Sequence, residues 1–421
     1  MSRGTVLVIG GGGTAGHVAD WSARLRDAAA ARGVRVEVAD EPSNVTGLWG
    51  DVAPAATWPL DYRDVAAACR LARERRAATD LRAVVGFREF SLAATSAAAA
   101  EVGLPWNPST AVARVRAKDR CREWLHAHGF AQPKVRVFDT ADAAEAHLRG
   151  RTAPAVVKPT DSFGSRGVRL VSPGEDPAGP IQEAFGHSSR VLIEDVIDGV
   201  PYSAEGILLR GQPHVLAVTA KSVSDPPYYV TLSNSIPAPL SPAQLHTVHE
   251  RIAAAVNCVG LTHSLFHVEF FWTAHGVVLG EMHGRPAGDW IHAMVAYRYP
   301  GVEPFGMVLD DVLGEPVSVP SEPDLSRAAA TLAVLSPPGI VAGVSGVEAA
   351  QATPGCLAVD VLVTPGTRIG TVTDSFQRAA LVVVAGQDVT EARDRAAEAA
   401  SRLTVHISSS PRAAATRSTS P

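Results

Sequence analysis

The stretch "AVVKPTDSFGSRGVRLV", residues 155–171, joins a short apolar run to a loop of small residues and then to a second apolar run. This pattern predicts a β-hairpin whose glycine-rich tip can fold over phosphate groups through its backbone N–H groups. Lys158 stands just before the tip, where its ammonium group can act as a compact point charge on a phosphate oxygen. A plainer alternative is that Lys158 lies at a sheet edge and that the glycines only form a turn.

Lysine is rare in this chain, which makes the position of each lysine informative. The 38 lysines and arginines include only four lysines, at Lys118, Lys134, Lys158 and Lys221. The abundance of alanine, arginine, glycine and valine is typical of a G+C-rich genome and indicates no function by itself.

Length and composition limit the classes of protein to consider. A chain of 421 residues exceeds the roughly 250–300 at which one core stops growing, so two or three domains are expected. With 46% hydrophobic residues and a net charge of -5, it resembles neither a nucleic-acid binder nor a polybasic membrane-surface protein. Small-molecule partners are therefore expected.

The cysteines and the N-terminal segment favour a cytoplasmic location. The four cysteines are widely scattered and form no CxxC pair, which argues against a disulfide framework or a zinc knuckle. The apolar run "TVLVIG", residues 5–10, is too short for a signal-peptide core or a membrane span.

The N-terminal segment predicts a Rossmann-like α/β lobe at residues 1–110. An apolar run, a glycine-rich turn, an alanine-rich helix and the run "VRVEVAD" form a βαβ unit, and residues 80–105 add another strand, turn and helix. Gly10–Gly16 could cradle a dinucleotide, with Asp40 or Glu41 at the distance of a ribose-binding acid. The alternative is a tight strand-to-helix turn without a ligand.

Two further segments belong to the central part of the chain. Residues 111–138 predict an amphipathic helix that stops at Gly129 and is followed by a strand, with Lys118 at the helix start. The segment "RVLIEDVIDGVPYSAEGILL", residues 190–209, predicts two strands separated by a turn at Asp198–Gly199. Exposed backbone near Glu194 and Asp195 could contact the edge of an adenine ring.

The densest chemistry lies in "LFHVEFFWTAHGVVLGEMHGRPAGDWI", residues 265–291. It predicts a hairpin of strands 266–273 and 277–283 around His275. Symmetric pairing about His275 places Glu269 opposite Glu281, and His267 opposite His283, on one face, with Cβ atoms roughly 4.5–5.5 Å apart. Two glutamates this close require a cation.

Magnesium is the cation we favour, because it is usually held by a few carboxylates together with substrate phosphates, and manganese could replace it. A mixed histidine and glutamate set could also bind zinc. Alternatively, the histidines only donate hydrogen bonds to the glutamates. Arg285, four residues after Glu281, could place its guanidinium beside a reacting phosphate or carboxylate.

The order of these motifs resembles that of the ATP-grasp superfamily of carboxylate–amine ligases, and most closely the L-amino-acid (dipeptide) ligases. The resemblance rests on a lysine at a helix start, "VVKP" with its loop, "IEDVIDG" and "HVE…GEMHGR". It implies an ATP-grasp core at 111–310, with a small lobe at 111–205 and a large lobe at 206–310. A C-terminal α+β lobe is expected at 311–407, followed by a disordered tail at 408–421.

The resemblance also implies roles for individual residues. Lys118 and Lys158 would contact ATP phosphates, and Glu269 and Glu281 would bind Mg²⁺. Arg285 would stabilise an acyl phosphate and the tetrahedral species that follows. The remaining implied contacts are the loop residues Gly164, Ser165 and Gly167, the adenine-binding residues Glu194, Asp195 and Val196, and the substrate-site residues His267, His283, Gly288 and Lys221.

Four positions depart from the pattern of the family. Ala117 replaces a frequent aspartate, and Pro201 replaces a frequent ribose-binding glutamate. His283 stands where many relatives have a metal-binding asparagine, and the loop "YYVTLSNSIPAP", residues 228–239, lacks its usual acidic residue. These departures leave the ribose contacts and the environment of a second metal ion open.

The implied activity is an ATP-dependent, ADP-forming ligation of an amino acid or another small carboxylic acid to an amine, in natural-product or amino-acid metabolism. His267, His263 or Lys221 could orient or deprotonate the amine. Similar enzymes are commonly dimers, so a homodimer is one expectation. The alternatives are an ATP-grasp carboxylase or purine-pathway-like ligase and, in another class, a dinucleotide-binding regulatory protein or oxidoreductase.

Overall fold

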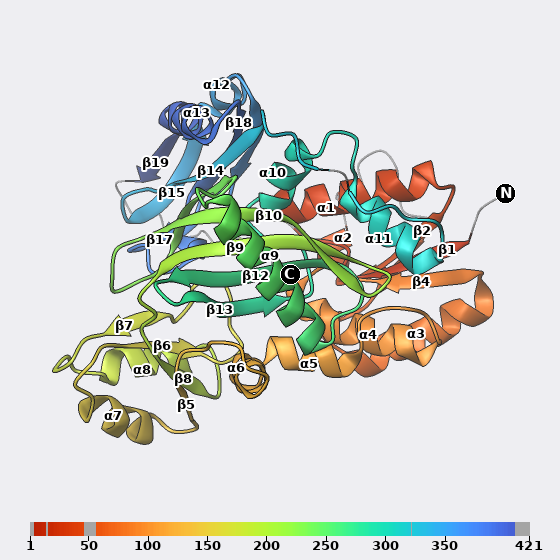
Figure 1. The fold of residues 1–421 in the computed structure, drawn as a ribbon. Coiled ribbons are helices and arrows are strands. Elements are labelled where there is room, and N and C mark those ends of the chain that lie inside the picture. The colour runs from red at the N-terminus through yellow and green to blue at the C-terminus, as the bar shows by residue number, and fades with distance from the viewer. Residues whose placement is uncertain (1–3, 14–15, 46–55, 321, 409–421) are drawn as a thin grey trace, which may run out of the picture.

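The computed structural model describes residues 4–13, 16–45, 56–320 and 322–408, and all statements below concern these residues. The fold is mixed α/β, with four sheets of four, eight, three and four strands. Figure 1 shows five strands of the large sheet in green across the middle, the N-terminal lobe in red and orange, and the small lobe in yellow.

The N-terminal lobe is a parallel sheet with the order β3-β2-β1-β4. Its strands are β1 Thr5–Ile9, β2 Arg35–Asp40, β3 Ala56–Pro59 and β4 Leu81–Val85. Its helices are α1 Gly16–Ala31, α2 Pro42–Val45, α3 Val65–Ala78, η1 Glu89–Ser91 and α4 Leu92–Glu101. The central strand β1, TVLVI, is a continuous buried run with almost only apolar residues, because parallel sheets are covered on both faces. The predicted βαβ unit is therefore confirmed, whereas β3 and α3 were not anticipated.

The small lobe is an antiparallel sheet with the order β5-β8-β6-β7. Two helices, α5 Ser109–Arg116 and α6 Lys118–Ala127, precede it. Its own elements are β5 Val135–Phe138, α7 Ala141–Arg149, β6 Ala155–Pro159, β7 Arg169–Val171, α8 Ala178–Phe185 and β8 Val191–Asp195. β6 pairs with β7 from Ala155↔Val171 to Val157↔Arg169, so the hairpin predicted at 155–171 is confirmed.

The large sheet has the order β13-β12-β9-β10-β11-β14-β18-β16. Its first five strands are β9 Val200–Leu209, β10 Gln212–Val223, β11 Thr231–Ile236, β12 Ser264–Thr273 and β13 Gly276–His283. Its helices are α9 Pro242–Val259, α10 Ile291–Arg298 and α11 Pro304–Leu313. The lobe boundary expected at 205/206 would cut through β9, which pairs along its whole length with β12, so the change of sheet lies between Asp195 and Val200.

The strands of the C-terminal segment, which was expected to be an α+β lobe at 311–407, belong to two sheets: three of them extend the large sheet, and three others form the small three-stranded sheet. The three in the large sheet are β14 Ala328–Val334, β16 Cys356–Val361 and β18 Ala380–Gly386. The other elements are β15 Gly339–Ser345, α12 Val347–Gln351, β17 Arg368–Ile369, η2 Ser375–Gln377, α13 Val389–Ser401 and β19 Thr404–Ser408. β19 was not anticipated, and residues 409–421 of the predicted disordered tail lie outside the described residues.

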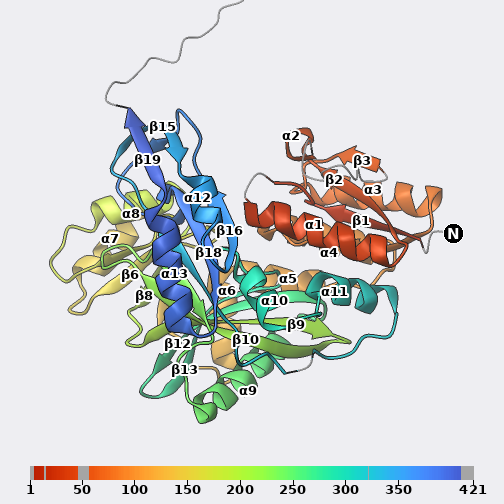
Figure 2. The same ribbon diagram turned by 90° about the horizontal axis from the view of Figure 1, so that it is seen from above.

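The two faces of the large sheet have different neighbours. Phe266, Val268 and Phe270 of β12 pack with the buried side of α9 in one apolar core. The opposite face joins the core of the N-terminal lobe, where Phe87 and Phe305 are in edge-to-face contact with their ring centroids 5.2 Å apart. Figure 2 shows α9 and the N-terminal lobe on these opposite faces. His267 and Glu269 alternate with the apolar residues of β12 and therefore point away from α9.

A β-bulge determines where Glu281 points. Near the turn, Phe270 pairs with Leu279, whereas further on Val268 pairs with Met282 and His267 with His283. The predicted pairing of the histidines is confirmed, but the strictly symmetric register is wrong, because Glu269 faces the extra residue of a bulge. Val277 and Leu279 point into the core beneath α9, so strict alternation would bury Glu281 there too. The bulge turns Glu281 to the face that carries Glu269.

The described helices include none long and apolar enough to span a bilayer. The four cysteines, Cys69, Cys121, Cys258 and Cys356, are all free thiols.

Gly206, at the centre of the large sheet, provides a test of this packing. An alanine Cβ there would lie 2.1 Å from Cζ of Phe266 and 2.4 Å from the carbonyl oxygen of His214. We expect Gly206→Ala to lower the free energy of unfolding by about 1–3 kcal/mol or more, measured by urea denaturation. Gly179→Ala, in α8 with no atom within 4 Å of its new Cβ, is the control and should not destabilise the protein. Equal effects would contradict the packing described.

Candidate active site

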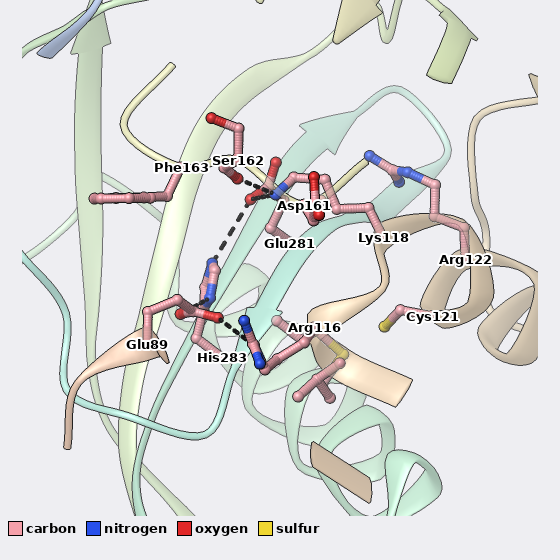
Figure 3. Close-up of a pocket in the computed structure, with 13 residues that line it drawn as sticks. Glu89, Arg116, Lys118, Cys121, Arg122, Asp161, Ser162, Phe163, Glu281 and His283 are labelled. Atoms are coloured by element: carbon pink, nitrogen blue, oxygen red, sulfur yellow. Dashed lines mark hydrogen bonds and ion pairs between the residues drawn. The ribbon is translucent and has the colours of Figure 1, made fainter. Parts of the chain in front are cut away.

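A pocket lies where the small lobe, the large sheet and the N-terminal lobe meet (Figure 3). Its wall includes Glu89 of η1, Lys118 of α6, Ser162 of the loop after β6, and Glu281 and His283 of β13. The bulge of β13 and the start of α6 bring these side chains together although they lie far apart in the sequence.

Glu281 lies beside two lysines and a histidine. One carboxylate oxygen lies 3.1 Å from Nζ of Lys118, the other lies 3.8 Å from Nζ of Lys158, and Nε2 of His283 is 3.7 Å away. Burial alone would raise the pKa of Glu281, but the ammonium groups of the two lysines outweigh it and bring the pKa to about 2. The carboxylate is therefore ionised throughout the neutral range.

Lys158 and Glu194 form a second buried group. Nζ of Lys158 lies 2.8 Å from one oxygen of Glu194, and Arg122 lies 3.0 Å from the other. Lys158 is 5% exposed, and burial lowers the pKa of its ammonium group from the usual value. The carboxylate of Glu194 thus fixes Lys158 at the pocket. Asp195 instead pairs with Arg151 at 2.7 Å, and Val196 is 38% exposed beside them.

Glu269, on the neighbouring strand β12, also has a lysine and a histidine as partners. It forms a short ion pair with Lys221 of β10, and Nε2 of His267 lies 3.5 Å from it. Nδ1 of His267 is 3.0 Å from Glu205, a buried carboxylate that also accepts hydrogen bonds from Ser203 and Thr219. Burial would lower the pKa of His267, but its two carboxylate partners raise it. The pKa of Glu269 is held well below its usual range, because Lys221 and His267 outweigh the effect of burial.

Glu89 was missed in the sequence and links the N-terminal lobe to this site. Its Oε2 accepts hydrogen bonds from Nε of Arg285 at 2.6 Å and from Nδ1 of His283 at 2.9 Å, and Arg116 lies 3.9 Å from its other oxygen. Burial alone would raise the pKa of Glu89, but its interactions with His283 and Arg285 hold it well below the usual value. One signal could have found it: Glu89 follows the carboxyl end of a parallel strand, where ligand sites of α/β sheets gather.

The glycine loop, residues 161–167, lies over the pocket. Gly164, Ser165 and Gly167 all have left-handed backbone, with φ angles of 68°, 59° and 70°. Lys118 donates a hydrogen bond of 2.7 Å to the carbonyl oxygen of Ser162, and Ser165 donates one of 2.8 Å to that of Tyr229. These two hydrogen bonds attach the loop to the start of α6 and to the backbone at Tyr229.

The loop after Arg285 is held by the C-terminal segment. Arg378, which is 5% exposed, donates two hydrogen bonds to Asp289, of 2.7 and 2.8 Å, and Trp290 donates one of 2.8 Å to Asp360. Asp289 and Trp290 both have left-handed backbone. Gly288 precedes them, and a Cβ there would meet no atom within 4 Å. His263 lies apart from this group, where it hydrogen-bonds with Thr262.

The glycine turn of the N-terminal lobe does not present the acid expected for a dinucleotide site. Asp40 is fully buried, and its carboxylate accepts hydrogen bonds from the backbone of Gly12 and Glu41 at 2.7 Å each, and from Asn44 at 2.9 Å. Glu41 pairs with Arg63. Residues 14 and 15 of the turn lie outside the described residues. The carboxylate of Asp40 therefore bonds to the turn and to its own neighbours in the chain. This agrees with the alternative of a tight turn without a ligand.

The side chains fit a magnesium ion that is shared with a phosphate ligand. Glu269 and Glu281 are ionised carboxylates on one face of the hairpin, and lysine ammonium groups offset their charge. Within the described ranges, no three histidine, cysteine, aspartate or glutamate side chains form a group that would hold a metal alone. Magnesium is usually bound by one or two carboxylates, with phosphate oxygens and water as its other ligands. Zinc sites, in contrast, supply three or four protein ligands.

Comparison with known families identifies two parts of the chain. Residues 151–294 match the ATP-grasp domain, and residues 333–408 match the L-amino acid ligase C-terminal domain 2. The chain therefore contains an ATP-grasp domain at residues 151–294. Together with the ligase relatives described next, these matches indicate an enzyme that forms C–N bonds, in a fold similar to that of L-amino acid ligases.

Two relatives and two solved structures are similar to this chain. An uncharacterized protein, y4rH, of Sinorhizobium fredii (strain NBRC 101917 / NGR234) is 28% identical over 73% of this chain and 67% of its own length. A D-alanine–D-alanine ligase of Corynebacterium urealyticum is 31% identical, but the match spans 32% of this chain and 40% of that protein.

The structural likeness extends over nearly the whole chain. The L-amino acid ligase from Bacillus licheniformis superposes with a TM-score of 0.79 at 19% identity, covering 97% of this chain and 100% of that one. A carboxyaminoimidazole ribonucleotide synthase from Aspergillus clavatus, complexed with ATP, gives a TM-score of 0.71 at 16% identity, covering 95% and 99%. At these identities the likeness establishes the shared fold.

The lowered pKa of Glu281 predicts a pH dependence of stability. A carboxyl group whose pKa falls from 4.5 to about 2 on folding stabilises the protein fully above pH 4.5, and this stability is lost as the pH falls through 2. We expect the difference in unfolding free energy between the wild type and Glu281→Gln to be about 1 kcal/mol smaller at pH 4 than at pH 7. Urea denaturation of both proteins at both pH values measures it. A difference that stays constant or grows towards pH 4 would contradict the ion pairs described.

Proposed function

We propose that the protein is an ATP-dependent, ADP-forming ligase that joins an amino acid or another small carboxylic acid to an amine. ATP and the two organic molecules are its substrates, and the reaction passes through an acyl phosphate. This activity is narrower than the C–N bond-forming class indicated by the domain matches.

One observation carries the proposal: three of the four lysines in the chain meet two partly buried carboxylates in one site. Lys118 and Lys158 adjoin Glu281, and Lys221 adjoins Glu269, whereas Lys134 is exposed on the small lobe. An ATP molecule brings several negative charges to a pocket. A cluster of lysines beside ionised carboxylates suits phosphate oxygens together with a divalent cation.

In this proposal the nucleotide lies between the small lobe and the large sheet. Lys118 and Lys158 contact its phosphates, and the loop of Gly164, Ser165 and Gly167 covers them. The backbone of residues 194–196 and the exposed side chain of Val196 contact the adenine, since the carboxylate of Glu194 is already paired with Lys158. Glu269 and Glu281 hold Mg²⁺, which supplies positive charge beside the phosphates when bound.

Arg285 is placed to act on the carboxylic acid substrate. In the reaction, the substrate carboxylate takes the γ-phosphoryl group of ATP, and the amine then displaces phosphate from the acyl carbon. The guanidinium of Arg285 and the ammonium groups of Lys158 and Lys221 offset the negative charge that develops on the oxygens. Glu89 orients Arg285 through its 2.6 Å hydrogen bond, and the closed glycine loop excludes water.

His267, His283, Lys221 and Gly288 are proposed to adjoin the substrates. His267 and His283 stack with ring centroids 5.7 Å apart and have carboxylates at both ends, so each ring is held in one orientation. Burial, aided by the charge of Arg285, lowers the pKa of His283, while that of His267 is raised. His283 is therefore the ring that favours its neutral form at neutral pH, and it is suited to accept a proton from the amine.

ADP and product analysis tests this function. Purified protein is incubated with Mg·ATP and pairs of amino acids or small carboxylic acids, and ADP, phosphate and product mass are measured. ADP with a product mass equal to that of a condensed pair is the expected result. AMP formation, or ADP formation that depends on bicarbonate, would contradict the proposal and favour another reaction class.

Lys158→Ala and Lys134→Ala form a matched pair of variants for the same assay. We expect Lys158→Ala to lower turnover by at least roughly 100-fold, because one charge on the transferred phosphate is lost, while Arg122 keeps Glu194 paired. Lys134→Ala, whose exposed side chain lies outside the site, should keep wild-type turnover. Near-normal activity of Lys158→Ala would show that the site is wrongly assigned.

A further inference from the structure

A short segment of the C-terminal lobe contacts two loops of the site at once. This segment, Asp374–Arg378, contains the 3-10 helix η2, and Asp374 caps it by accepting a 2.7 Å hydrogen bond from the backbone of Phe376. One end touches the glycine loop over the pocket, and the other end touches the loop after Arg285. We call Asp374–Arg378 the clasp.

The first end of the clasp holds the tip of the glycine loop. The backbone N–H of Ser375 donates a 2.9 Å hydrogen bond to the carbonyl oxygen of Gly164. The Phe376 ring packs edge to face with Phe163 at a centroid distance of 5.4 Å, and the guanidinium carbon of Arg166 lies 4.0 Å from the Phe376 centroid. A side chain at Gly164 would place its Cβ 2.9 Å from the Phe376 ring, so the close approach requires glycine.

The second end of the clasp is an ion pair with the loop after Arg285. Arg378 donates two hydrogen bonds to Asp289 and a third, of 2.9 Å through Nε, to the carbonyl oxygen of Ser375. Ser375 therefore joins both ends: its N–H contacts the glycine loop and its carbonyl contacts Arg378. The contact with the glycine loop and the contact with Arg378 are thus linked by the two peptide groups on either side of Ser375.

The two ends differ in strength. Arg378 is 5% exposed, and separating its ion pair would leave a buried charge without its partner. Phe376 and Phe163 are 46% and 36% exposed, and aromatic and cation–π contacts at such exposed positions are weak. The aromatic end can therefore separate while the ion pair stays intact. Such separation would open the pocket, because Ser162 and Phe163 form part of its wall.

We propose that Phe376 is a positioning residue that holds the glycine loop closed during the reaction, and that the clasp links this closed position to the loop after Arg285. The proposal rests on the function proposed above. Phe90 of the N-terminal lobe also contacts Phe163, at a centroid distance of 5.3 Å, so side chains of two lobes contact one loop residue. A loop that closes incompletely admits water to the acyl phosphate, and ATP is then consumed without amide formation.

Phe376→Ala tests the proposal, with Leu357→Ala as control and Phe376→Tyr as rescue. Leu357 is a 38% exposed apolar residue of β16 in the same lobe. The first measurement is the rate of trypsin cleavage after Arg166, identified by mass, with and without Mg·ATP. We expect at least threefold faster cleavage in Phe376→Ala and wild-type rates in Leu357→Ala and Phe376→Tyr.

The second measurement is the ratio of ADP released to amide formed. We expect a ratio near one in the wild type and in both comparison variants, and at least a twofold higher ratio in Phe376→Ala. Phe163→Ala combined with Phe376→Ala should have a smaller effect than the two single changes added together, because both changes remove the contact between these two rings. Unchanged cleavage and an unchanged ratio in Phe376→Ala would overturn the proposal.

The two proposals can fail separately. If the wild type forms ADP but no amide with any pair, the ligase function fails, while the cleavage rates still decide whether Phe376 holds the loop. If the wild type forms amide and Phe376→Ala behaves like Leu357→Ala in both measurements, the ligase function stands and the clasp is refuted.

Discussion

The site depends on two ionised carboxylates that the β12–β13 hairpin places on one face of the large sheet. The bulge in β13 is the cause, since strict alternation after Val277 and Leu279 would have sent Glu281 into the apolar core under α9. Glu269 and Glu281 repel each other, and this repulsion raises the pKa of Glu281 against the lysines that lower it. The surrounding cations are needed to keep both carboxylates charged.

The cations and their partners come from all parts of the chain, so the site exists only when the lobes are packed together. Lys118 is supplied by the start of α6, Lys158 by the small lobe and Lys221 by the large sheet. The N-terminal lobe adds Glu89, which orients Arg285, and the C-terminal lobe adds Arg378, which holds Asp289. Relative motion of the lobes would therefore change the distances between charges, which suits a pocket that must open to admit a nucleotide.

Local patterns in the sequence predicted a large share of this arrangement. Both hairpins, the βαβ unit, the helix start at Lys118 and the pairing of His267 with His283 follow from apolar alternation and turn residues within short segments. The bulge was missed because one extra residue leaves the alternating pattern of a short strand nearly unchanged. Glu89 and Arg378 were missed because their partners are about 90 to 200 residues away, and single-sequence patterns do not show such contacts. The extension of the large sheet by β14, β16 and β18 is another long-range pairing of this kind.

The central claim is that Glu269 and Glu281 hold a divalent cation together with the nucleotide, and calorimetric titration of ATP tests it most directly. ATP is titrated into the wild type and into a Glu269→Gln/Glu281→Gln variant, each with Mg²⁺ and with EDTA. The account predicts at least roughly tenfold weaker binding to the wild type without Mg²⁺, a difference of about 1.4 kcal/mol, and no such dependence in the variant. Equal affinity of the wild type with and without Mg²⁺, or a full metal dependence in the variant, would contradict the account.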